Sequence, residues 1–118
     1  MKNKITLLAE VKNIDISPNA IEAFCTRWQV IEFALFGSVL REDFRPDSDI
    51  DVIVRFDPNA HPTFLSLEKM ELELQSIFER EVDVVTREGI ETSLNYLRRH
   101  EILSSAKVIY EKRQSVST

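Results

Sequence analysis

The sequence predicts a mixed α/β (α+β) domain, in which one small mixed β-sheet is covered mainly on one face by helices. Two observations lead to this fold class. β-prone runs at 30–36, 49–56, 81–86 and 107–111 alternate with helical patterns along the chain. The composition, with 43% hydrophobic and 30% charged residues, is typical of a globular protein. At 118 residues, we expect one domain over residues 1–118.

Charge and cysteine content exclude several classes of protein. Twenty acidic residues against fifteen Lys and Arg give a net charge of -5, which disfavours direct nucleic-acid binding because such binding depends on neutralising phosphates. Cys25 is the single cysteine, so neither an intrachain disulfide nor a cysteine-based metal site can form. The apolar run at 5–9 is too short for a signal peptide or a membrane span, so we expect a cytoplasmic protein without a membrane partner.

The N-terminal part begins with a poorly defined arm or helix over residues 1–16, where the apolar spacing favours a short helix. Ser17 followed by Pro18 predicts the start of the next helix, because Ser caps helices and Pro is tolerated at the first helical position. Helical spacing then places one apolar face of this helix, including the cysteine, in the core: Ile21, Phe24, Cys25 and Trp28.

The first β-prone run, 30–36, ends at Gly37 and predicts a strand. Residues 38–44 are long enough for about two helical turns, and Pro46 then predicts a loop. The second strand is expected at 49–56, followed by a loop that contains two prolines.

The longest helical pattern covers 63–79, and its apolar stripe consists of Leu67, Met70, Leu74, Ile77 and Phe78. Leu65 and Leu72 fall on the opposite face, as ordinary exposed leucines or as an interface. A third strand is expected at 81–86. Ile90, Leu94 and Leu97 then suggest a helical segment that is broken or continues to 105. A short strand follows at 107–111, and we expect the tail 112–118 to be frayed.

Two acidic residues share one side of the second strand. Because side chains alternate along a strand, Asp49 and Asp51 point to the same face, and the apolar residues between and after them point to the other. Paired carboxylates repel unless a cation compensates their charge. Oxygen ligands without cysteine or paired histidines favour Mg²⁺, with Mn²⁺ as an alternative.

Asp83 lies between two valines on the third strand, so its carboxylate points away from the apolar face. If this strand lies beside the second one, Asp49, Asp51 and Asp83 converge. Three carboxylates can bind two metal ions that stabilise the entering and leaving oxygens of a phosphoryl transfer. In that arrangement Asp83 would also accept the proton of an attacking hydroxyl.

Gly37 and Ser38 stand at the end of the first strand, where a phosphate can approach the backbone. A nucleoside triphosphate would bind there, with Arg41 adding positive charge. Taken alone, Gly37-Ser38 is also an ordinary turn and Arg41 an ordinary surface residue. Of Arg98 and Arg99, at most one can face the same site, because adjacent helical residues diverge by about 100°.

Gly37-Ser38, ten residues and then Asp49-Ile50-Asp51 form the pattern GSx10DxD, which resembles that of the polymerase-β-like nucleotidyltransferases. With Asp83 and the ending LRRHEILSSAKVIYE, the chain is similar to the minimal nucleotidyltransferase family over residues 18–112. The resemblance implies a nucleotidyltransferase-like fold, ATP as substrate and Mg²⁺ bound by the three aspartates. Many relatives have glycine after the arginine that Arg41 matches, where this chain has Glu42, so the shape of this loop is expected to differ.

Members of this family commonly pair with a HEPN-domain ribonuclease toxin, which they silence as antitoxins by transferring AMP to a tyrosine. The resemblance therefore implies a metal-dependent antitoxin that modifies a HEPN partner within a hetero-oligomer. Two alternatives remain at this point: an antitoxin that blocks its partner by contact alone, and an adenylyltransferase acting on a small molecule such as an antibiotic. The intact acidic positions disfavour the first, and the small size of the chain disfavours the second.

Overall fold

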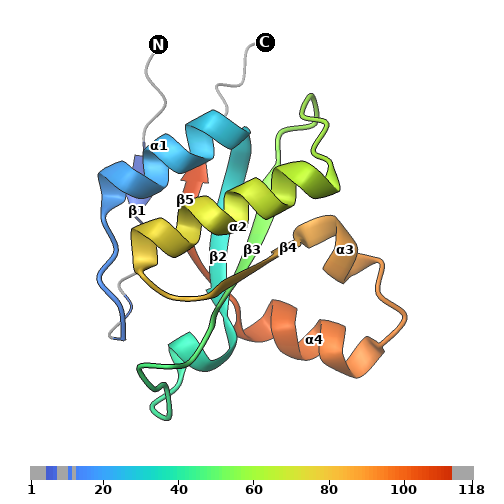
Figure 1. Ribbon diagram of the computed structural model, residues 1–118. Coiled ribbons are helices and arrows are strands. Elements are labelled where there is room, and N and C mark those ends of the chain that lie inside the picture. The colour runs from blue at the N-terminus through green and yellow to red at the C-terminus, as the bar shows by residue number, and fades with distance from the viewer. Residues whose placement is uncertain (1–4, 8–10, 12, 113–118) are drawn as a thin grey trace.

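The computed structural model describes residues 5–7, 11 and 13–112 of the chain. One sheet forms the centre, with two helices across its front and two below and to the right in the view of Figure 1. In chain order the elements are β1 (Ile5–Leu7), α1 (Pro18–Trp28), β2 (Val30–Phe36), the 3-10 helix η1 (Gly37–Leu40), β3 (Ile50–Phe56), α2 (Phe64–Phe78), β4 (Val82–Thr86), α3 (Arg87–Glu91), α4 (Tyr96–Ser105) and β5 (Lys107–Lys112).

The strand order in the sheet is β1-β5-β2-β3-β4. β3 and β4 are parallel, and the other neighbouring strands are antiparallel, so the sheet is mixed, as predicted. The four strands expected from the sequence are all present, with ends within one residue of the prediction. β2 is central because it pairs with both β3 and β5.

The N-terminal expectation was wrong where the structure describes it. The apolar spacing over 1–16 favoured a helix, whereas Ile5–Leu7 forms β1, which pairs with β5 at an edge of the sheet. A strand of three residues is too short to show a period of its own, so pairing with a distant segment decides its structure. The rest of this segment, apart from residue 11 and residues 13–16, lies outside the described residues. The frayed tail was expected at 112–118, but Lys112 is the last residue of β5, and residues 113–118 lie outside the described residues.

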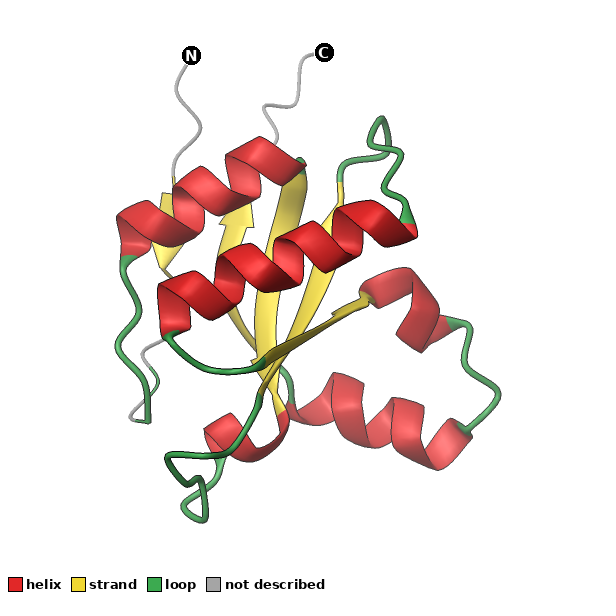
Figure 2. Ribbon diagram, in the orientation of Figure 1, coloured by secondary structure: helices red, strands yellow, loops and turns green. Residues whose placement is uncertain are grey.

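α1 and α2 begin where the sequence predicts. The Ser17 hydroxyl accepts a hydrogen bond from the N–H of Ala20 and caps α1. Thr63 caps α2 through a reciprocal pair of hydrogen bonds with Ser66. Figure 2 shows the two helices side by side across one face of the strands.

The larger hydrophobic core lies between this helical pair and the sheet. It contains the apolar faces of α1 and α2, including the predicted Cys25. From the sheet it contains Phe33, Leu35, Ile50, Val52, Val54, Val82 and Val84. The alternate residues of β2, β3 and β4 therefore point to the opposite face.

That opposite face carries a smaller apolar cluster. Ala34, Phe36 and Ile53 pack there against Ile102 of α4, with Ile90 of α3 at the margin. The helical segment expected from residue 90 onward is broken into α3 and α4, one of the two outcomes left open.

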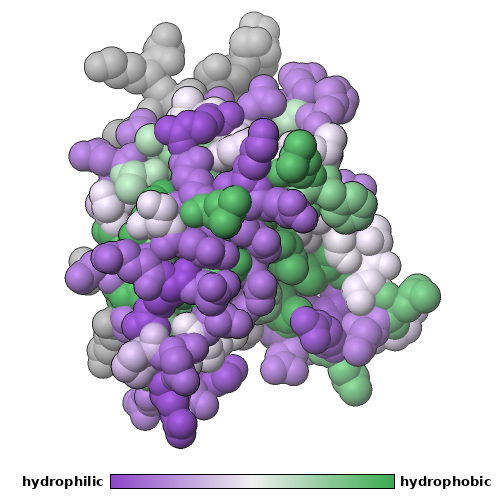
Figure 3. All heavy atoms as spheres, viewed as in Figure 1, coloured by the Kyte–Doolittle hydropathy of each residue, from purple (hydrophilic) through white to green (hydrophobic). Residues whose placement is uncertain are grey.

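Leu94 and Leu97 do not continue the apolar stripe of Ile90: they are 90% and 84% exposed. Hydrophobic side chains are visible in Figure 3 at the lower right, where α3 leads into α4. Leu65 and Leu72 on α2 are also exposed, as expected from their position opposite the apolar stripe. Among the described residues, no helix has the length and apolar content needed to cross a membrane.

Candidate active site

Two of the predicted acidic residues are direct neighbours in the sheet. Asp51 of β3 and Asp83 of β4 occupy paired positions in the parallel ladder, so the predicted neighbouring of their strands is confirmed. Parallel strands lie about 4.8 Å apart, which places the two side chains next to each other on the face of the smaller cluster. Asp49 directly precedes β3 and is exposed.

Gly37 is packed directly against Asp51. The φ angle of Gly37 is +78°, a left-handed conformation that residues with a side chain rarely adopt. A Cβ atom at Gly37 would lie 2.5 Å from Oδ2 of Asp51. In the antiparallel ladder, Phe36 is the position opposite Asp51. Glycine is therefore required here both by the backbone conformation and by the space that the carboxylate occupies.

The pKa of Asp51 reflects its burial and the charges around it. Burial of the Asp51 carboxyl raises its pKa above the ordinary value of 3.8, and the negative charges of Asp83 and Asp49 raise it further. The positive charges of Arg98 and Arg41 act in the opposite direction and lower this pKa, without cancelling the rise. Two acids and two arginines thus act by charge on Asp51 at this end of the sheet.

The turn after Gly37 is shorter than predicted. Instead of two helical turns over 38–44, the chain forms the single 3-10 turn η1, which ends where the N–H of Arg41 donates to the carbonyl of Ser38 at 2.9 Å. The Ser38 hydroxyl donates to the carbonyl of Asp49 at 3.4 Å and so links the turn to the start of β3. The side chain of Asn13 donates to the carbonyl of Val39, which a continued helix would have used for its own hydrogen bond. Asn13 also donates to the carbonyl of Arg41, which in addition accepts from the N–H of Phe44.

The arginines near the site differ in their contacts. Arg41 is exposed, and its Nε lies 3.1 Å from Oδ1 of Asp43. Arg99 donates to the backbone carbonyls of Glu91 and Ser93 and stacks over the ring of Tyr96. Arg98 instead acts on Asp51 by charge. The adjacent arginines therefore have different neighbours, and which one faces the acids depends on how α4 lies against the sheet.

The loop between η1 and β3 is held by Arg80, a residue that no sequence motif indicates. Nη1 of Arg80 lies 2.9 Å from the carbonyl of Arg45 and 2.8 Å from that of Pro46. Its guanidinium also stacks over the ring of Phe44, with 4.5 Å between the guanidinium carbon and the ring centroid. This side chain fixes the segment that leads into Asp49.

The acidic residues fit a hard cation that shares its ligands with a substrate. Among the described residues, no group of three His, Cys, Asp or Glu side chains forms a complete metal-binding set. Mg²⁺, however, is commonly bound by one or two carboxylates together with substrate phosphates and water. The neighbouring carboxylates of Asp51 and Asp83 meet that requirement. Burial and, after it, repulsion by the other acids raise the pKa of Asp51, and a bound cation would offset both effects.

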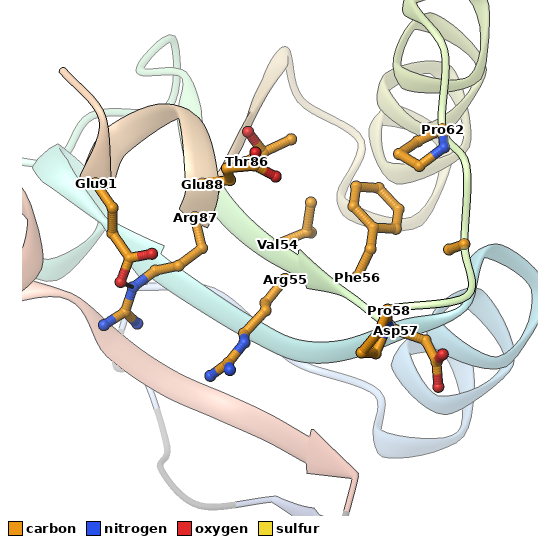
Figure 4. Close-up of a pocket in the computed structure, with 11 residues that line it drawn as sticks. Val54, Arg55, Phe56, Asp57, Pro58, Pro62, Thr86, Arg87, Glu88 and Glu91 are labelled. Carbon is orange, nitrogen blue, oxygen red and sulfur yellow. Dashed lines mark hydrogen bonds and ion pairs between the residues drawn. The ribbon is translucent and has the colours of Figure 1, made fainter.

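Two cavities lie outside the acidic cluster. One, of about 370 Å³, is at the opposite end of β3 and is lined among others by Arg55, Phe56, Arg87 and Glu91 (Figure 4). Arg87 is already paired there with Glu32 and Glu91. The second cavity, of about 360 Å³, lies beside η1, where Asn13 and Arg41 line it. None of the three aspartates lines either cavity. We therefore place the site on the open surface around the aspartates.

The family model described as nucleotidyltransferase domain matches residues 18–114. A provisionally named protein adenylyltransferase of Methanocaldococcus jannaschii is 36% identical over 64 residues, which are 54% of this chain and 64% of that relative. This chain thus spans somewhat less than two thirds of that relative. A second protein of the same organism and provisional name is 29% identical over 90 residues, 76% of this chain and 100% of the relative.

Solved structures share the fold. A provisionally named minimal nucleotidyltransferase matches with a TM-score of 0.58 and 29% identity, over 75% of this chain and 85% of that one. A toxin-antitoxin structure with AMP-PNP matches with a TM-score of 0.63 and 19% identity, over 84% of this chain and 77% of that one. A complex of the tri-AMPylated Shewanella oneidensis HEPN toxin with an MNT antitoxin matches with a TM-score of 0.54 and 19% identity, over 79% of this chain and 68% of that one. The last two likenesses concern the fold alone.

Proposed function

This chain belongs to the nucleotidyltransferase domain family, and we propose that it transfers AMP from ATP to a hydroxyl group of a partner protein. The observation that carries the proposal is the placement of Asp51. Its carboxylate lies beside Asp83 on one side and against the Gly37 turn on the other. Metal ligands and a phosphate-binding turn are thereby within reach of one triphosphate.

The turn and two arginines are suited to holding the phosphates. Gly37 allows the turn to lie directly against Asp51, and the Ser38 hydroxyl follows it in the chain. Arg41 and Arg98 are exposed, and their positive charges reach Asp51. We assign the triphosphate to the space between these groups, where cationic side chains would offset its charge.

We assign the binding of two Mg²⁺ ions to Asp49, Asp51 and Asp83. Mn²⁺ could replace Mg²⁺ at these positions. Bound Mg²⁺ would neutralise charge on the phosphates and on the leaving pyrophosphate. The residues orient this chemistry: Asp51 is fixed by the sheet on both sides, and the Arg80 contacts hold the segment that leads to Asp49.

The transfer itself is a displacement at the α-phosphorus of ATP. A bond forms between the acceptor oxygen and this phosphorus, while the bond to the bridging oxygen breaks and pyrophosphate leaves. The proton of the acceptor hydroxyl passes to a carboxylate, and Asp83 is assigned this role because it is exposed at the margin of the acidic cluster.

We propose that the acceptor belongs to a HEPN-domain toxin, which AMP transfer to a tyrosine silences. The support is the fold likeness to the antitoxin in the complex with the tri-AMPylated HEPN toxin. The surface of this chain agrees with a protein acceptor: Leu94, Tyr96 and Leu97 are 68–90% exposed directly before Arg98. Apolar and aromatic side chains of this kind are enriched in protein interfaces.

The test uses the full chain, labelled ATP, Mg²⁺ and a purified HEPN protein from the same genome. We expect label to be transferred to the HEPN protein and its ribonuclease activity to be lost. Asp51→Asn should abolish transfer, whereas Asp47→Asn, the same charge change in the exposed loop, should leave it intact.

One outcome would favour the alternative of inhibition by contact. If the HEPN protein is inhibited equally by the wild type and by Asp51→Asn, and carries no label in either case, the chain does not act by AMP transfer. Mass spectrometry of the labelled product identifies the acceptor residue, and modification at a residue other than tyrosine would correct that part of the proposal.

A further inference from the structure

Asn13 connects the segment before α1 to the turn that follows Gly37. Its Nδ2 donates to the carbonyl of Val39 at 2.6 Å and to the carbonyl of Arg41 at 2.8 Å. Both partners are carbonyl oxygens, which only accept hydrogen bonds, so the amide nitrogen must be the atom that faces them. A single NH₂ group thus binds two backbone positions of the turn.

Both sides of this contact are fixed to the larger core. Ile14 and Ile16, which follow Asn13, pack against that core. α1 begins at Pro18, two residues after Ile16. On the other side, Val39 is fully buried in the same core. The contact therefore joins two anchored segments, which makes it more than a transient surface interaction.

The contact explains where the helical turn ends. In a continued α-helix the carbonyl of Val39 would accept from the N–H four residues later. Asn13 donates to that acceptor instead, and the chain leaves the turn at Arg41 with φ -106° and ψ 160°, an extended conformation. The carbonyl of Arg41 accepts both from Asn13 and from the N–H of Phe44. Asn13 thereby sets the direction in which the chain continues from η1.

We propose that Asn13 is a positioning residue for the nucleotide, holding the Ser38–Arg41 turn in the single-turn conformation that receives the triphosphate. This inference rests on the proposed function, since it concerns the same phosphate-binding turn. Asn13 precedes residues 18–114, the part of the chain that matches the family. A segment outside the matched domain thus completes the binding site.

The first test measures, without a ligand, how far the hydrogen bonds of Asn13 restrain the turn. We expect Asn13→Leu, which is similar in size but cannot donate, to speed amide hydrogen exchange within 38–44. Exchange at Arg45 and Ser48 should not change, because their N–H groups bond to each other's residues within a loop that Arg80 holds independently. Asn19→Leu, on the exposed side of α1, is the matched control and should leave exchange in the turn unchanged.

The second test measures binding of AMP-PNP with Mg²⁺ to the same full-length variants. Asn13→Leu should raise the dissociation constant about tenfold, whereas Asn19→Leu should not change it. Asn13→Gln keeps an amide donor and should recover part of the affinity. With a labelled acceptor, the KM for ATP should rise while kcat at saturating ATP stays near the wild-type value, as expected for a residue that positions the turn.

The outcomes are distinguishable. Unchanged exchange in Asn13→Leu, or faster exchange with an unchanged dissociation constant, overturns the role of Asn13 and leaves the proposed function intact. Absence of AMP-PNP binding by the wild type overturns the proposed function, and this inference with it. Should Asn13→Leu fail to fold, Asn13→Asp replaces it, because an ionised carboxylate of the same shape accepts but cannot donate.

Discussion

Asp51 is the residue at which the structural and chemical demands on this protein conflict. Its partial burial makes the ionised form unfavourable, and the negative charges of Asp83 and Asp49 add to this effect. A fold selected for stability alone would place a neutral residue at this position. A carboxylate kept under repulsion is common at functional sites, where binding of a cation or a substrate compensates the cost.

The repulsion predicts a dependence of stability on pH. The pKa of Asp51 is raised in the folded state above the ordinary aspartate pKa of 3.8. Ionisation of this group therefore destabilises the fold once the pH rises above about 3.8. Asp51→Asn should therefore increase the free energy of unfolding at about pH 7, by less than about 1 kcal/mol because solvent screens a partly exposed group. The gain should disappear below about pH 3, where the carboxyl is protonated in both states.

Thermal unfolding at both pH values measures this effect. Asp47→Asn, in the exposed loop, is the control for the change in net charge. Mg²⁺ should stabilise the wild type more than Asp51→Asn. Equal stability of the wild type and Asp51→Asn at neutral pH would show that Asp51 is not under repulsion.

Gly37 gives a second prediction at the scale of one residue. Gly37→Ala would introduce a Cβ atom 2.5 Å from the Asp51 carboxylate at a φ angle of +78°. We expect a loss of at least about 1–2 kcal/mol in the free energy of unfolding, the typical cost of a left-handed conformation for a residue with Cβ, together with loss of transfer activity.

Gly89→Ala is the comparison for this variant. Its Cβ atom would lie 2.9 Å from the Thr86 hydroxyl, but Gly89 has no positive φ angle and is remote from the acidic cluster. It should therefore lose less stability and keep AMP-PNP binding. If Gly37→Ala bound AMP-PNP as well as the wild type does, the close approach to Asp51 would have no role in the site.

Among the elements, α4 decides which cation faces the acids. Its first turn carries Arg98 and Arg99, and Ile102 one turn later is buried against Phe36 and Ile53 of the sheet. Arg98 and Ile102 are four residues apart and so lie on the same side of the helix. Arg99, three residues before Ile102, also lies near this side, but its guanidinium is held by the carbonyls of Glu91 and Ser93. Arg98 is the arginine of this pair whose charge acts on Asp51.

This orientation predicts a function for Arg98 in nucleotide binding. Arg98→Ala should raise the dissociation constant of AMP-PNP about five- to tenfold through loss of a charged contact with phosphate. Arg98→Lys should keep most of the affinity, and His100→Ala, also exposed on α4, should have no effect. Isothermal titration calorimetry measures all three, and full affinity in Arg98→Ala would remove Arg98 from the site.

For the whole molecule, the sheet separates a structural face from a chemical one. α1 and α2 bury one face completely, and Cys25 is fully buried there. The other face has a smaller apolar cluster, partly covered by α3 and α4, and the acids lie beside it. Substrates can thus approach the acids without any opening of the larger core.

Cys25 provides a probe of this arrangement. Burial raises the pKa of its thiol far above the ordinary value, so the reactive thiolate is not formed in the folded protein. We expect Cys25 to react with Ellman's reagent at the rate of global unfolding, and Mg²⁺ with AMP-PNP to slow this reaction by stabilising the folded state.

An exposed thiol is the control for this measurement. Ser76→Cys on the exposed side of α2 should react at once in the native protein. Rapid reaction of Cys25 in wild type, under conditions where the fold is stable, would show that the larger core opens locally.

Much of the fold and site follows from local sequence patterns. The alternation of polar and apolar residues places Asp51 and Asp83 on the same face, and Ser17 and Thr63 start their helices, because such signals depend on residues that are close in the chain. The GSx10DxD spacing likewise indicates the turn and the acids. These features needed no knowledge of distant contacts.

Other features were decided only by tertiary structure. β1 exists because β5 offers it an edge, and the difference between Arg98 and Arg99 follows from the contacts of Arg99 with the carbonyls of Glu91 and Ser93. The single turn after Gly37 ends at the hydrogen bonds of Asn13, 26 and 28 residues away in the chain. Residues that meet only after the chain has folded leave no periodic signal in the sequence. The sequence alone therefore determined which groups we assign to the chemistry, and the tertiary contacts decided how they are held.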